Sequence, residues 1–304
     1  MKIISTGKYL PKEILSNYDL EKMVDTSNEW IAQRTGIKER RIAKKESCLD
    51  LAYKASKRAI KKANYDSRNI DLIIVATITA ETASPSIASM LQAKLKLNNK
   101  DTICFDINAA CTGFIYALHV ANQMLASGQY KGALVVGAEK LSNVIDYTDR
   151  NTCILFGDGA GAMIIEKDAQ PAYFYLSSKG DEEKLSVENN KLRMNGKAVF
   201  SFAVRAIQET INKLLYETNL KIDDIEKIIP HQANMRITKT AAENMGIDHD
   251  LFYMNIANYG NTSAASVIIA LDEYLEETKP LDGKNIMLLA FGAGLTWGGA
   301  LLKL

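Results

Sequence analysis

The sequence predicts an α/β fold made of two similar halves, and two observations support this prediction. The first is an alternation of apolar, β-rich runs with helical patterns, which is typical of α/β proteins. Buried strands are expected at residues 70–78 (IDLIIVATI), 102–107 (TICFDI), 132–139 (GALVVGAE) and 153–166 (CILFGDGAGAMIIE). Between them, residues 49–63 repeat Leu and Ala at a spacing of four with the lysines elsewhere, as in a helix that covers a sheet.

The second observation is an internal repeat with an offset of about 150 to 156 residues. The later segments that resemble earlier ones are 227–234 (matching 71–78), 255–275 (matching 106–125) and 285–294 (matching 132–139). This offset is far longer than a solenoid repeat, so it indicates two related α/β units packed together. We place the halves at residues 1–168 and 169–304, with the polar segment 179–191 as a surface loop near their junction.

Composition narrows the class of protein. The chain has 304 residues, 47% of them hydrophobic, with 37 basic against 36 acidic groups and no basic stripe, which argues against nucleic-acid binding. No apolar run has the length of a signal peptide or a membrane span, so we expect a cytoplasmic protein without a membrane partner. The four cysteines lack CxxC spacing, so neither a disulfide scaffold nor a metal site is expected.

Cys111 is the cysteine with a local context suited to chemistry. It lies in FDINAACTGFIYALHVANQML, where a strand ends, small residues follow, and residues 112–124 form a helical pattern. A sulfur at a helix N-terminus is favoured as thiolate, the form in which cysteine is a nucleophile. Taken alone, however, a cysteine among alanines is more often a small core residue.

The chain has three histidines, and His231 is the candidate for a functional role. It follows the apolar run EKIIP and precedes QANMRITKTAA, which reads as the start of a helix. The end of a strand in an α/β sheet is where ligands tend to bind. His249 lies in a polar stretch and reads as a solvated loop residue, whereas His119 falls inside an apolar helix and reads as a core or groove residue.

Asn261 lies in NYGNTSAASVIIAL, directly before a buried helix of small residues. Asparagine is a good helix cap, which is the simplest explanation for its place. The internal repeat suggests more, because Asn261 lies close to the position equivalent to Cys111 in the second half. Two pseudo-symmetric strand-to-helix turns would point both side chains into one cavity.

Two glycine-rich segments do not fit nucleotide binding. Residues 157–162 (GDGAGA) run into a strand where a phosphate-binding helix is required, and residues 291–304 lack the GK[ST] of a P-loop. Their glycines are better explained by tight turns and close backbone approach, which leave N–H groups free to line a site.

Several segments together resemble the thiolase-fold condensing enzymes, and among them the type III 3-oxoacyl-(acyl carrier protein) synthases. The segments, which span nearly the whole chain in the family's order, are DTSNEWIAQRTGI (25–37), AACTGFIYAL (109–118), GDGAGA (157–162), PHQANMRI (230–237), YGNTSAAS (259–266) and FGAGLTWGGALL (291–302). The resemblance implies a thiolase-like arrangement of the two pseudo-symmetric halves in α/β/α/β/α layers.

The resemblance also implies a mechanism. Cys111 would take an acyl group from an acyl-CoA starter, in a ping-pong reaction without a cofactor or metal. His231 and Asn261 would then bind a malonyl group on acyl carrier protein and stabilise the enolate that forms as CO₂ leaves. That enolate would attack the acyl group. Backbone N–H groups of Cys111 and of Ala293, in the turn 292–294, resemble the oxyanion hole.

Substrate-binding residues follow from the same resemblance. Trp30 and Arg150 match residues that hold the adenine of CoA, and the matches along the phosphate and pantetheine path are Thr26, Arg34, Gly196 and Asn234. The segment that receives acyl carrier protein corresponds to Gln232, Ala233, Asn234, Met235 and Arg236, with Arg236 offering charge to an acidic surface. The family implies a homodimer. Ordinary helix packing is the other explanation for Trp30.

Two features of the sequence depart from relatives. Ser84 precedes Pro85 where acetyl-preferring members often have an aromatic residue, which suggests a roomier acyl pocket for branched or longer starters. Glu243 and Asn244 replace a Lys-Lys pair found in some relatives, although Lys239 is kept, so the contact with the carrier protein is expected to differ.

Four other classes of protein remain to be weighed. A condensing enzyme of polyketide or secondary metabolism would use the same three residues with another acceptor. A degradative thiolase would need a second cysteine as base, and none follows Cys153. A papain-like protease would need a CGSCW segment, which is absent. A lipid-carrier or dimerisation module would bind acyl-CoA without forming a covalent adduct.

Overall fold

The N-terminal half is built around one mixed β-sheet. The computed structural model describes residues 1–97, 101–189, 191–278 and 282–304. Within these ranges the strands of this sheet lie in the order β1-β7-β6-β4-β5. Their bounds are β1 Lys2–Tyr9, β4 Ile70–Ala76, β5 Ile103–Ile107, β6 Gly132–Glu139 and β7 Gly159–Glu166. β4 is parallel to β5 and β6, and β7 is antiparallel to β1 and β6.

The predicted strand at residues 153–166 is wrong in its first part. Helix α6 (Arg150–Cys153) precedes β7, which begins only at Gly159. The turn between them is held by Asp158, whose carboxylate accepts hydrogen bonds from the backbone N–H groups of Ala43 and Ser142. These contacts come from distant parts of the chain, so the apolar pattern of the segment does not reveal them.

The C-terminal half has its own sheet, in which the strands of the described residues lie in the order β11-β12-β13-β8. The bounds are β8 Ala172–Ser178, β11 Ile225–Pro230, β12 Asn285–Gly292 and β13 Thr296–Lys303. β11 and β12 are parallel, and the other two pairings are antiparallel. The two sheets therefore take their strands from residues 2–166 and 172–303, and a domain boundary at residues 168 and 169 remains a prediction.

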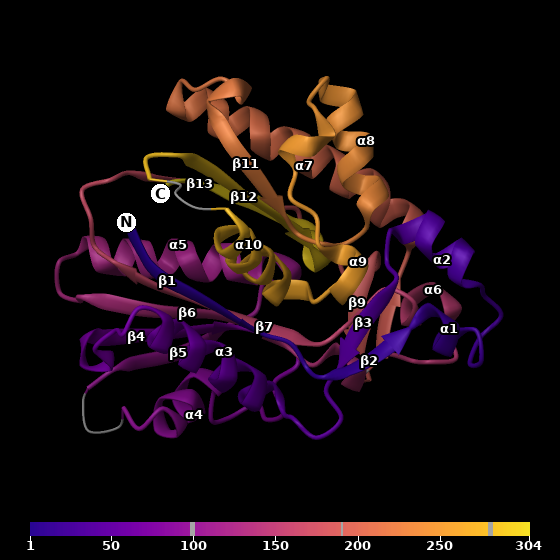
Figure 1. The fold of residues 1–304 in the computed structure, drawn as a ribbon, viewed down its shortest axis with the longest axis horizontal. Helices are drawn as coiled ribbons and strands as arrows, with labels where there is room; N and C mark the ends of the chain where they lie inside the picture. Colours follow the sequence, from indigo (N-terminus) through magenta and orange to yellow (C-terminus); the bar gives the residue numbers. More distant parts are fainter. Residues whose placement is uncertain (98–100, 190, 279–281) are drawn as a thin grey trace.

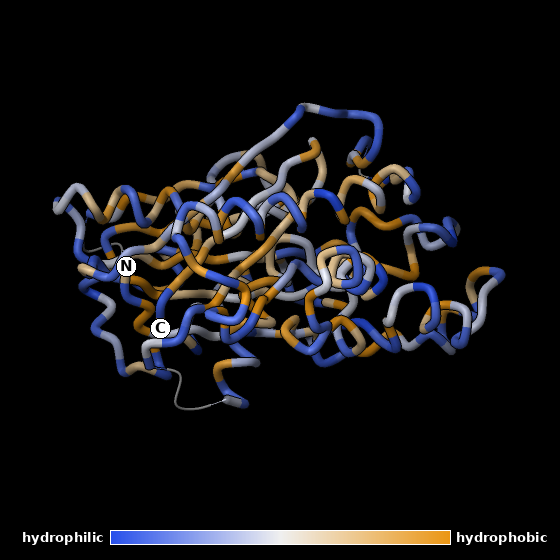
Figure 2. The backbone as a smooth tube through the Cα atoms, turned by 90° about the horizontal axis from the view of Figure 1, so that it is seen from above, coloured by the Kyte–Doolittle hydropathy of each residue, from blue (hydrophilic) through white to orange (hydrophobic). Residues whose placement is uncertain are grey.

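Helices cover both sheets and fill the space between them (Figure 1). α3 (Cys48–Lys62) and α4 (Ile87–Lys94) pack on the outer face of the first sheet. α5 (Gly113–Ala126) and α10 (Ser266–Glu277) lie between the sheets and share one core with strands of both. α7 (Gly196–Thr218) and α8 (Met235–Met245) cover the outer face of the second sheet. The predicted α/β/α/β/α layering is confirmed, and Figure 2 shows hydrophobic residues along these inner elements and hydrophilic residues at the outer turns.

The glycines of GDGAGA serve helix packing. A Cβ added at Gly161 of β7 would lie 2.4 Å from Cγ2 of Ile268 on α10, and one at Gly159 would lie 3.0 Å from Cδ1 of Ile269. The central helix can approach the sheet closely only because these side chains are absent. This supports the sequence interpretation that the segment is not a phosphate loop.

Smaller elements surround the open end of the layers. These are β2 (Glu13–Ser16), α1 (Asn17–Leu20), α2 (Asn28–Thr35), β3 (Glu39–Ile42), β9 (Leu185–Glu188), β10 (Lys191–Met194) and α9 (Ile256–Tyr259). β9 and β10 pair as an antiparallel ladder, so the expectation of a plain surface loop at residues 179–191 is wrong for its second part. Leu185 and Leu192 pack inward in this hairpin, which the polar composition of the segment conceals.

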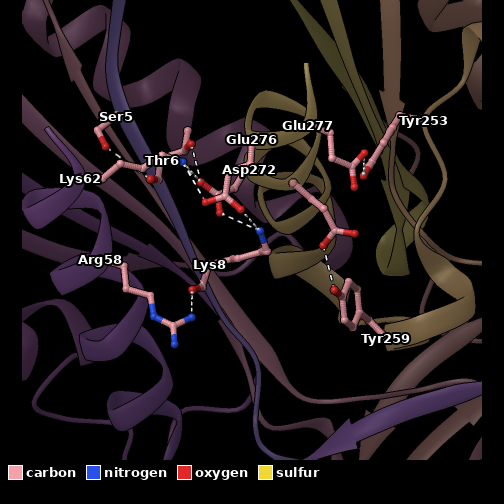
Figure 3. Close-up of polar contacts among 11 residues, drawn as sticks. Ser5, Thr6, Lys8, Arg58, Lys62, Tyr253, Tyr259, Asp272, Glu276 and Glu277 are labelled. Atoms are coloured by element: carbon pink, nitrogen blue, oxygen red, sulfur yellow. Dashed lines mark hydrogen bonds and ion pairs between the residues drawn. The ribbon is translucent and has the colours of Figure 1, made fainter. Parts of the chain in front are cut away.

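A polar cluster joins the two halves on one side (Figure 3). Asp272 of α10 is 1% exposed and accepts a hydrogen bond of 2.7 Å from the Thr6 hydroxyl of β1. Its carboxylate also pairs with Lys62 at 3.0 Å and Lys8 at 3.3 Å, and both lysines contact Glu276 one turn later. The cluster fixes α10 against β1 and α3. Across the described ranges, no helix combines the length and apolar character needed to cross a membrane.

Candidate active site

Cys111 lies where the first sheet meets the central helices. The chain leaves β5, makes a 3-10 turn at Ala110–Thr112, and continues directly into α5. Ala110 has a positive φ of 46°, which turns the chain sharply before the cysteine. Gly292, at the end of β12, packs against it, since an added Cβ would lie 2.9 Å from the Cys111 nitrogen and 3.0 Å from its Cβ. The backbone thus positions this thiol from both halves.

The thiol of Cys111 is not a resting thiolate, contrary to the expectation from its place before a helix. Burial raises the pKa of Cys111 to about 12, although the nearby Ser263 side chain and the backbone at Cys111 oppose this rise. Desolvation disfavours the charged form more strongly than the partial charge at a helix start favours it. The proton must therefore leave as the sulfur attacks.

His231 follows β11 directly and is nearly inaccessible to solvent. Its Nδ1 lies 2.6 Å from the hydroxyl of Ser266 on α10. That hydroxyl also accepts a weak 3.4 Å hydrogen bond from the backbone N–H of Gln232, so its own proton is free to be donated to Nδ1. The remaining hydrogen of the ring is then on Nε2. Burial lowers the pKa of His231 to about 3, which favours the neutral ring at physiological pH and leaves an Nε2–H that can donate a hydrogen bond.

Asn261 lies just before α10. Its Oδ1 accepts a 2.8 Å hydrogen bond from the backbone N–H of Ser263, which fixes the side chain and leaves the amide NH₂ group to donate. Cys111, His231 and Asn261 all line one cavity of about 110 Å³. The structure therefore brings together the three residues singled out from the sequence, although they lie in three separate segments of the chain.

A second cavity of about 310 Å³ lies on the other side of Cys111. Apolar side chains dominate its lining, namely Ile78, Leu141, Phe156, Leu185, Val187 and Leu192. Ala293, the predicted oxyanion-hole residue, also lines this cavity, together with Ser263. Cys111, Phe156 and Leu185 line both cavities, so the thiol lies where the two cavities adjoin, and His231 and Asn261 line the smaller one.

The residues expected to bind CoA gather around Trp30 on α2. The guanidinium groups of Arg150 and Arg34 lie 5.0 and 5.7 Å from the centre of the Trp30 ring. Asn234 donates a 3.1 Å hydrogen bond from Nδ2 to the Arg34 carbonyl and also lines the smaller cavity. It therefore connects that cavity to the group formed by Trp30, Arg34 and Arg150. The exposed Gly196 lines the same cavity.

Two further expectations on ligand binding meet different outcomes. The hydroxyl of Thr26 is buried without a hydrogen-bond partner among the described residues, as a ligand-contacting group would be before binding. Ser84 is exposed and lines neither cavity of this chain. Its predicted place in the acyl pocket is therefore not formed within the described residues of one chain.

The expected surface for a carrier protein is only partly available. Gln232 is buried, with its NH₂ group donating to the carbonyls of Pro230 and Tyr253 and its Oε1 accepting from the N–H groups of Asn255 and Ile256. Its side chain is therefore not free for a partner protein, and the sequence prediction for it is wrong. The run PHQAN gives no sign that the second polar residue points inward to hold the loop.

The other members of that segment remain at or near the surface. Arg236 is exposed at the start of α8, with its guanidinium 5.8 Å from the ring centre of Phe200. Lys239 is also exposed, 3.9 Å from Glu243. Ala233, Asn234 and Met235 are partly exposed. Arg236 thus offers a positive charge beside Phe200, which lines the smaller cavity.

Sequence reasoning missed Glu139 and Ser263. Glu139 ends the apolar strand β6 and is fully buried, and the Ser263 hydroxyl donates a 3.1 Å hydrogen bond to its carboxylate. A single carboxylate at the end of an otherwise apolar strand was the available signal. Elsewhere in the described chain, no group of three or more His, Cys, Asp or Glu side chains is placed to hold a metal ion.

Comparisons with known proteins agree with this geometry. Residues 105–181 match the family 3-oxoacyl-[acyl-carrier-protein (ACP)] synthase III, and residues 215–304 match its C-terminal family. The β-ketoacyl-[acyl-carrier-protein] synthase III of Acholeplasma laidlawii is 49% identical, covering 100% of this chain and 98% of the relative.

Solved structures agree as well. The 3-oxoacyl-[acyl-carrier-protein] synthase III of Aquifex aeolicus has a TM-score of 0.96 at 47% identity, covering 100% of this chain and 99% of that one. The priming β-ketosynthase of the R1128 polyketide pathway has a TM-score of 0.93 at 32% identity, covering 100% and 96%. Fold and relatives define a condensing acyltransferase of the thiolase fold. The chain belongs to the 3-oxoacyl-[acyl-carrier-protein] synthase III family.

Proposed function

We propose that this enzyme condenses an acyl-CoA starter with malonyl-acyl carrier protein, with loss of CO₂, and so begins fatty acid synthesis. The meeting of Cys111, His231 and Asn261 in one cavity is the observation that carries the proposal. A thiol that lines two cavities suits a reaction in which an acyl chain is stored in one and a second substrate enters the other, where His231 and Asn261 lie.

In the first half-reaction the sulfur of Cys111 attacks the thioester carbonyl of acyl-CoA, and CoA leaves as its thiolate. The charge that develops on the carbonyl oxygen is met by backbone N–H groups at Cys111 and Ala293. The acyl chain then occupies the apolar cavity. The arrangement of Trp30, Arg34 and Arg150 suits a nucleotide, because it offers a ring for stacking and two cations for phosphate.

In the second half-reaction the malonyl thioester enters the smaller cavity. The Nε2–H of His231 and the NH₂ group of Asn261 donate hydrogen bonds to the thioester oxygen, which stabilises the enolate left when CO₂ departs. A neutral histidine suits this role, because its Nε2–H can donate a hydrogen bond to the enolate oxygen while the proton stays on the ring. The enolate carbon attacks the acyl group, and Cys111 leaves as thiolate.

The starter is proposed to be a branched or longer acyl group. The apolar cavity of about 310 Å³ supports this preference. Ser84, which lines neither cavity of its own chain, would add room only through the loop of a second copy. Rates of acyl-enzyme formation across acetyl-, isobutyryl- and hexanoyl-CoA would measure it. Strict selectivity for acetyl-CoA would contradict it.

A cytoplasmic homodimer is proposed as the working form. β5 is an edge strand of the first sheet, and its Ile103 is 38% exposed with Phe105 and Ile107 half-buried. An edge strand with apolar side chains favours pairing with a second copy. Sedimentation equilibrium is expected to give twice the chain mass, and a monomer that retains full activity would contradict the proposal.

Intact mass spectrometry tests the function directly. Incubation with a panel of acyl-CoAs is expected to add one acyl mass to the enzyme and none to Cys111→Ser. Supplying malonyl-acyl carrier protein should then discharge the adduct as a 3-oxoacyl product, whereas malonyl-CoA should do so poorly. Efficient discharge by malonyl-CoA would instead favour the polyketide-type alternative. Absence of any adduct on the wild-type enzyme would overturn the proposal.

Two charge variants separate the substrate surfaces. Arg150→Ala removes a cation from the Trp30 patch and is expected to raise KM for acyl-CoA roughly tenfold, with KM for malonyl-acyl carrier protein unchanged. Arg236→Glu is expected to raise KM for malonyl-acyl carrier protein and to leave KM for acyl-CoA unchanged. The variant places a negative charge where the acidic carrier protein would meet a positive one. If either variant raises both constants equally, the assignment of separate surfaces is wrong.

A further inference from the structure

Glu139 is a buried carboxylate in contact with the active site. It ends β6 with no solvent exposure. Its oxygens accept hydrogen bonds from the Thr79 hydroxyl at 2.7 Å, the Ser263 hydroxyl at 3.1 Å, and the backbone N–H of Ile78 at 3.2 and 3.3 Å. These donors hold the group in place, and burial still raises the pKa of Glu139 to about 7. A carboxyl with such a pKa can accept and release protons near neutral pH.

Ser263 connects this carboxylate to the nucleophile. Ser263 and Cys111 both line the apolar cavity, and the Ser263 side chain is close enough to the thiol of Cys111 to influence its pKa. Because the Ser263 hydroxyl donates its proton to Glu139, it can accept the proton of the thiol. Ser263 therefore lies between the nucleophile and the carboxylate, and its hydrogen bond to Glu139 points in the direction that proton transfer to the carboxylate requires.

The reaction needs an acceptor for this proton. Among the described residues that line the two cavities, Cys111 and His231 are the side chains that titrate. Burial lowers the pKa of His231 to about 3, which makes it a weak base, and raises the pKa of the thiol to about 12. Neither group can account for loss of the thiol proton near neutral pH.

We propose that Glu139, acting through Ser263, receives the thiol proton of Cys111 while the acyl-enzyme forms. The inference rests on the proposed function. As the bond from sulfur to the acyl carbon forms and the bond from that carbon to CoA breaks, the thiol proton passes to Ser263 and the Ser263 proton passes to Glu139. The CoA thiolate takes its proton from solvent. In the condensation Cys111 leaves as thiolate and regains a proton along the same path, so Glu139 is ionised again.

The surroundings of Glu139 contain few other charges. The negative charge of Glu139 raises the pKa of two nearby thiols, those of Cys111 in the turn before α5 and of Cys48 at the start of α3. Glu81 lies on the far side of Cys48 and raises the pKa of that thiol further. Lys140 follows in the chain but turns its Nζ away, to the carbonyl of Glu46 at 2.8 Å.

Acyl-enzyme formation should be timed by rapid quench and intact mass between pH 5.5 and 9. The wild-type rate is expected to rise with pH through a pKa of about 7 and then level off, since the carboxylate form is the acceptor. Glu139→Gln keeps the shape of the side chain and should react roughly 100-fold more slowly, with a rate that climbs to high pH without a plateau. Ser263→Ala should show the same profile. Alanine can adopt the backbone conformation of residue 263, because Ala110 in this same protein has a φ of 46° and Ser263 has a φ of 49°.

Asp158→Asn is the matched control. It removes another buried carboxyl whose hydrogen bonds go to Ala43 and Ser142 instead of the nucleophile, and it should keep the wild-type profile. Glu139→Asp should recover part of the rate and the plateau. A purely structural role for Glu139 predicts equal loss in the Asp and Gln variants with no change in the profile, and would overturn the relay.

Alkylation of Cys111 by iodoacetamide, followed on the Cys111 peptide, gives a readout that needs no acyl-CoA. The relay predicts slower alkylation of Glu139→Gln than of the wild type at pH 7.5. If Glu139 only repels a thiolate, its removal lowers the pKa of the thiol and alkylation becomes faster, which overturns the relay. A wild-type enzyme that alkylates but never forms an acyl-enzyme would refute the proposed function alone.

Discussion

Asn108 and Asn261 occupy equivalent places in the two halves of the fold. Each lies two residues before a residue with positive φ, Ala110 at 46° and Ser263 at 49°. In each case Oδ1 of the asparagine accepts a hydrogen bond from the backbone N–H of that residue, at 3.4 Å in the first half and 2.8 Å in the second. A 3-10 turn and a long central helix follow in both.

This equivalence corrects the alignment of the internal repeat. The residue that corresponds to Cys111 is Ala264, and Asn261 corresponds to Asn108. The nucleophile therefore exists in one half only. The second half keeps the same turn and uses its asparagine to complete the site, which explains how a symmetric scaffold holds an asymmetric reaction centre.

Gly292→Ala should displace Cys111 from its position in the active site. The new Cβ would lie 2.9 Å from the Cys111 nitrogen, which is closer than such atoms normally approach, so the turn must shift. We expect acyl-enzyme formation to fall by roughly 100-fold, since small misplacements of a reacting group carry such penalties. Rapid-quench mass spectrometry of the folded variant measures this.

The control for this variant is Gly132→Ala, at the start of β6. An added Cβ there would meet the Tyr65 hydroxyl at 2.4 Å and the Asn69 carbonyl at 2.7 Å, so it too crowds the core. Stability should fall while the acylation rate of the folded protein stays near that of the wild type. Equal loss of acylation in both variants would show that Gly292 has no specific effect.

Ser266→Ala should slow condensation without slowing acylation. Its hydroxyl holds Nδ1 of His231 at 2.6 Å and so keeps the hydrogen on Nε2. Loss of one such hydrogen bond is expected to lower the rate of condensation about tenfold. Single-turnover rates of the two half-reactions separate the effects. Ser56→Ala removes a buried hydroxyl that bonds the Ala52 carbonyl on α3, and should change neither.

Asp272→Asn should destabilise the contact between the halves. It leaves Lys8 and Lys62 without their buried carboxylate partner, and both lysines are partly shielded from water. We expect the free energy of unfolding to fall by about 2 to 3 kcal/mol, measured by denaturant titration. Lys44→Ala breaks only an exposed pair with Glu13 and should change it by less than about 0.5 kcal/mol. Similar values for both would refute the role of the cluster.

Stability should decline as pH rises from about 5 to 7. The pKa of Glu139 is raised from 4.5 to about 7 in the folded protein, so over this range the native state binds a proton that the unfolded chain has lost. The unfolding free energy then falls with pH, by up to about 3 kcal/mol in total. Glu139→Gln should flatten this slope in denaturant titrations at several pH values. An unchanged slope would show that Glu139 is not the source.

The sequence contained enough to predict the layers and the three central side chains. Apolar runs and the spacing of Leu and Ala are local properties, and each follows from which faces must be buried. The motifs around Cys111, His231 and Asn261 could be read because each lies at a strand or helix end. The errors fell where distant contacts dominate, as in the inward-facing Gln232 and the hairpin of β9 and β10.

The α/β class, the internal repeat and the candidate nucleophile could all be read from the amino-acid sequence, because they depend on the order of residue types along the chain. Only the tertiary structure decided the protonation states at the site. Burial sets the pKa values of Cys111 and His231, and Ser263 meets Glu139 across a separation of 124 residues. Desolvation depends on everything packed around a group, and so it is fixed only when the two halves close over the site.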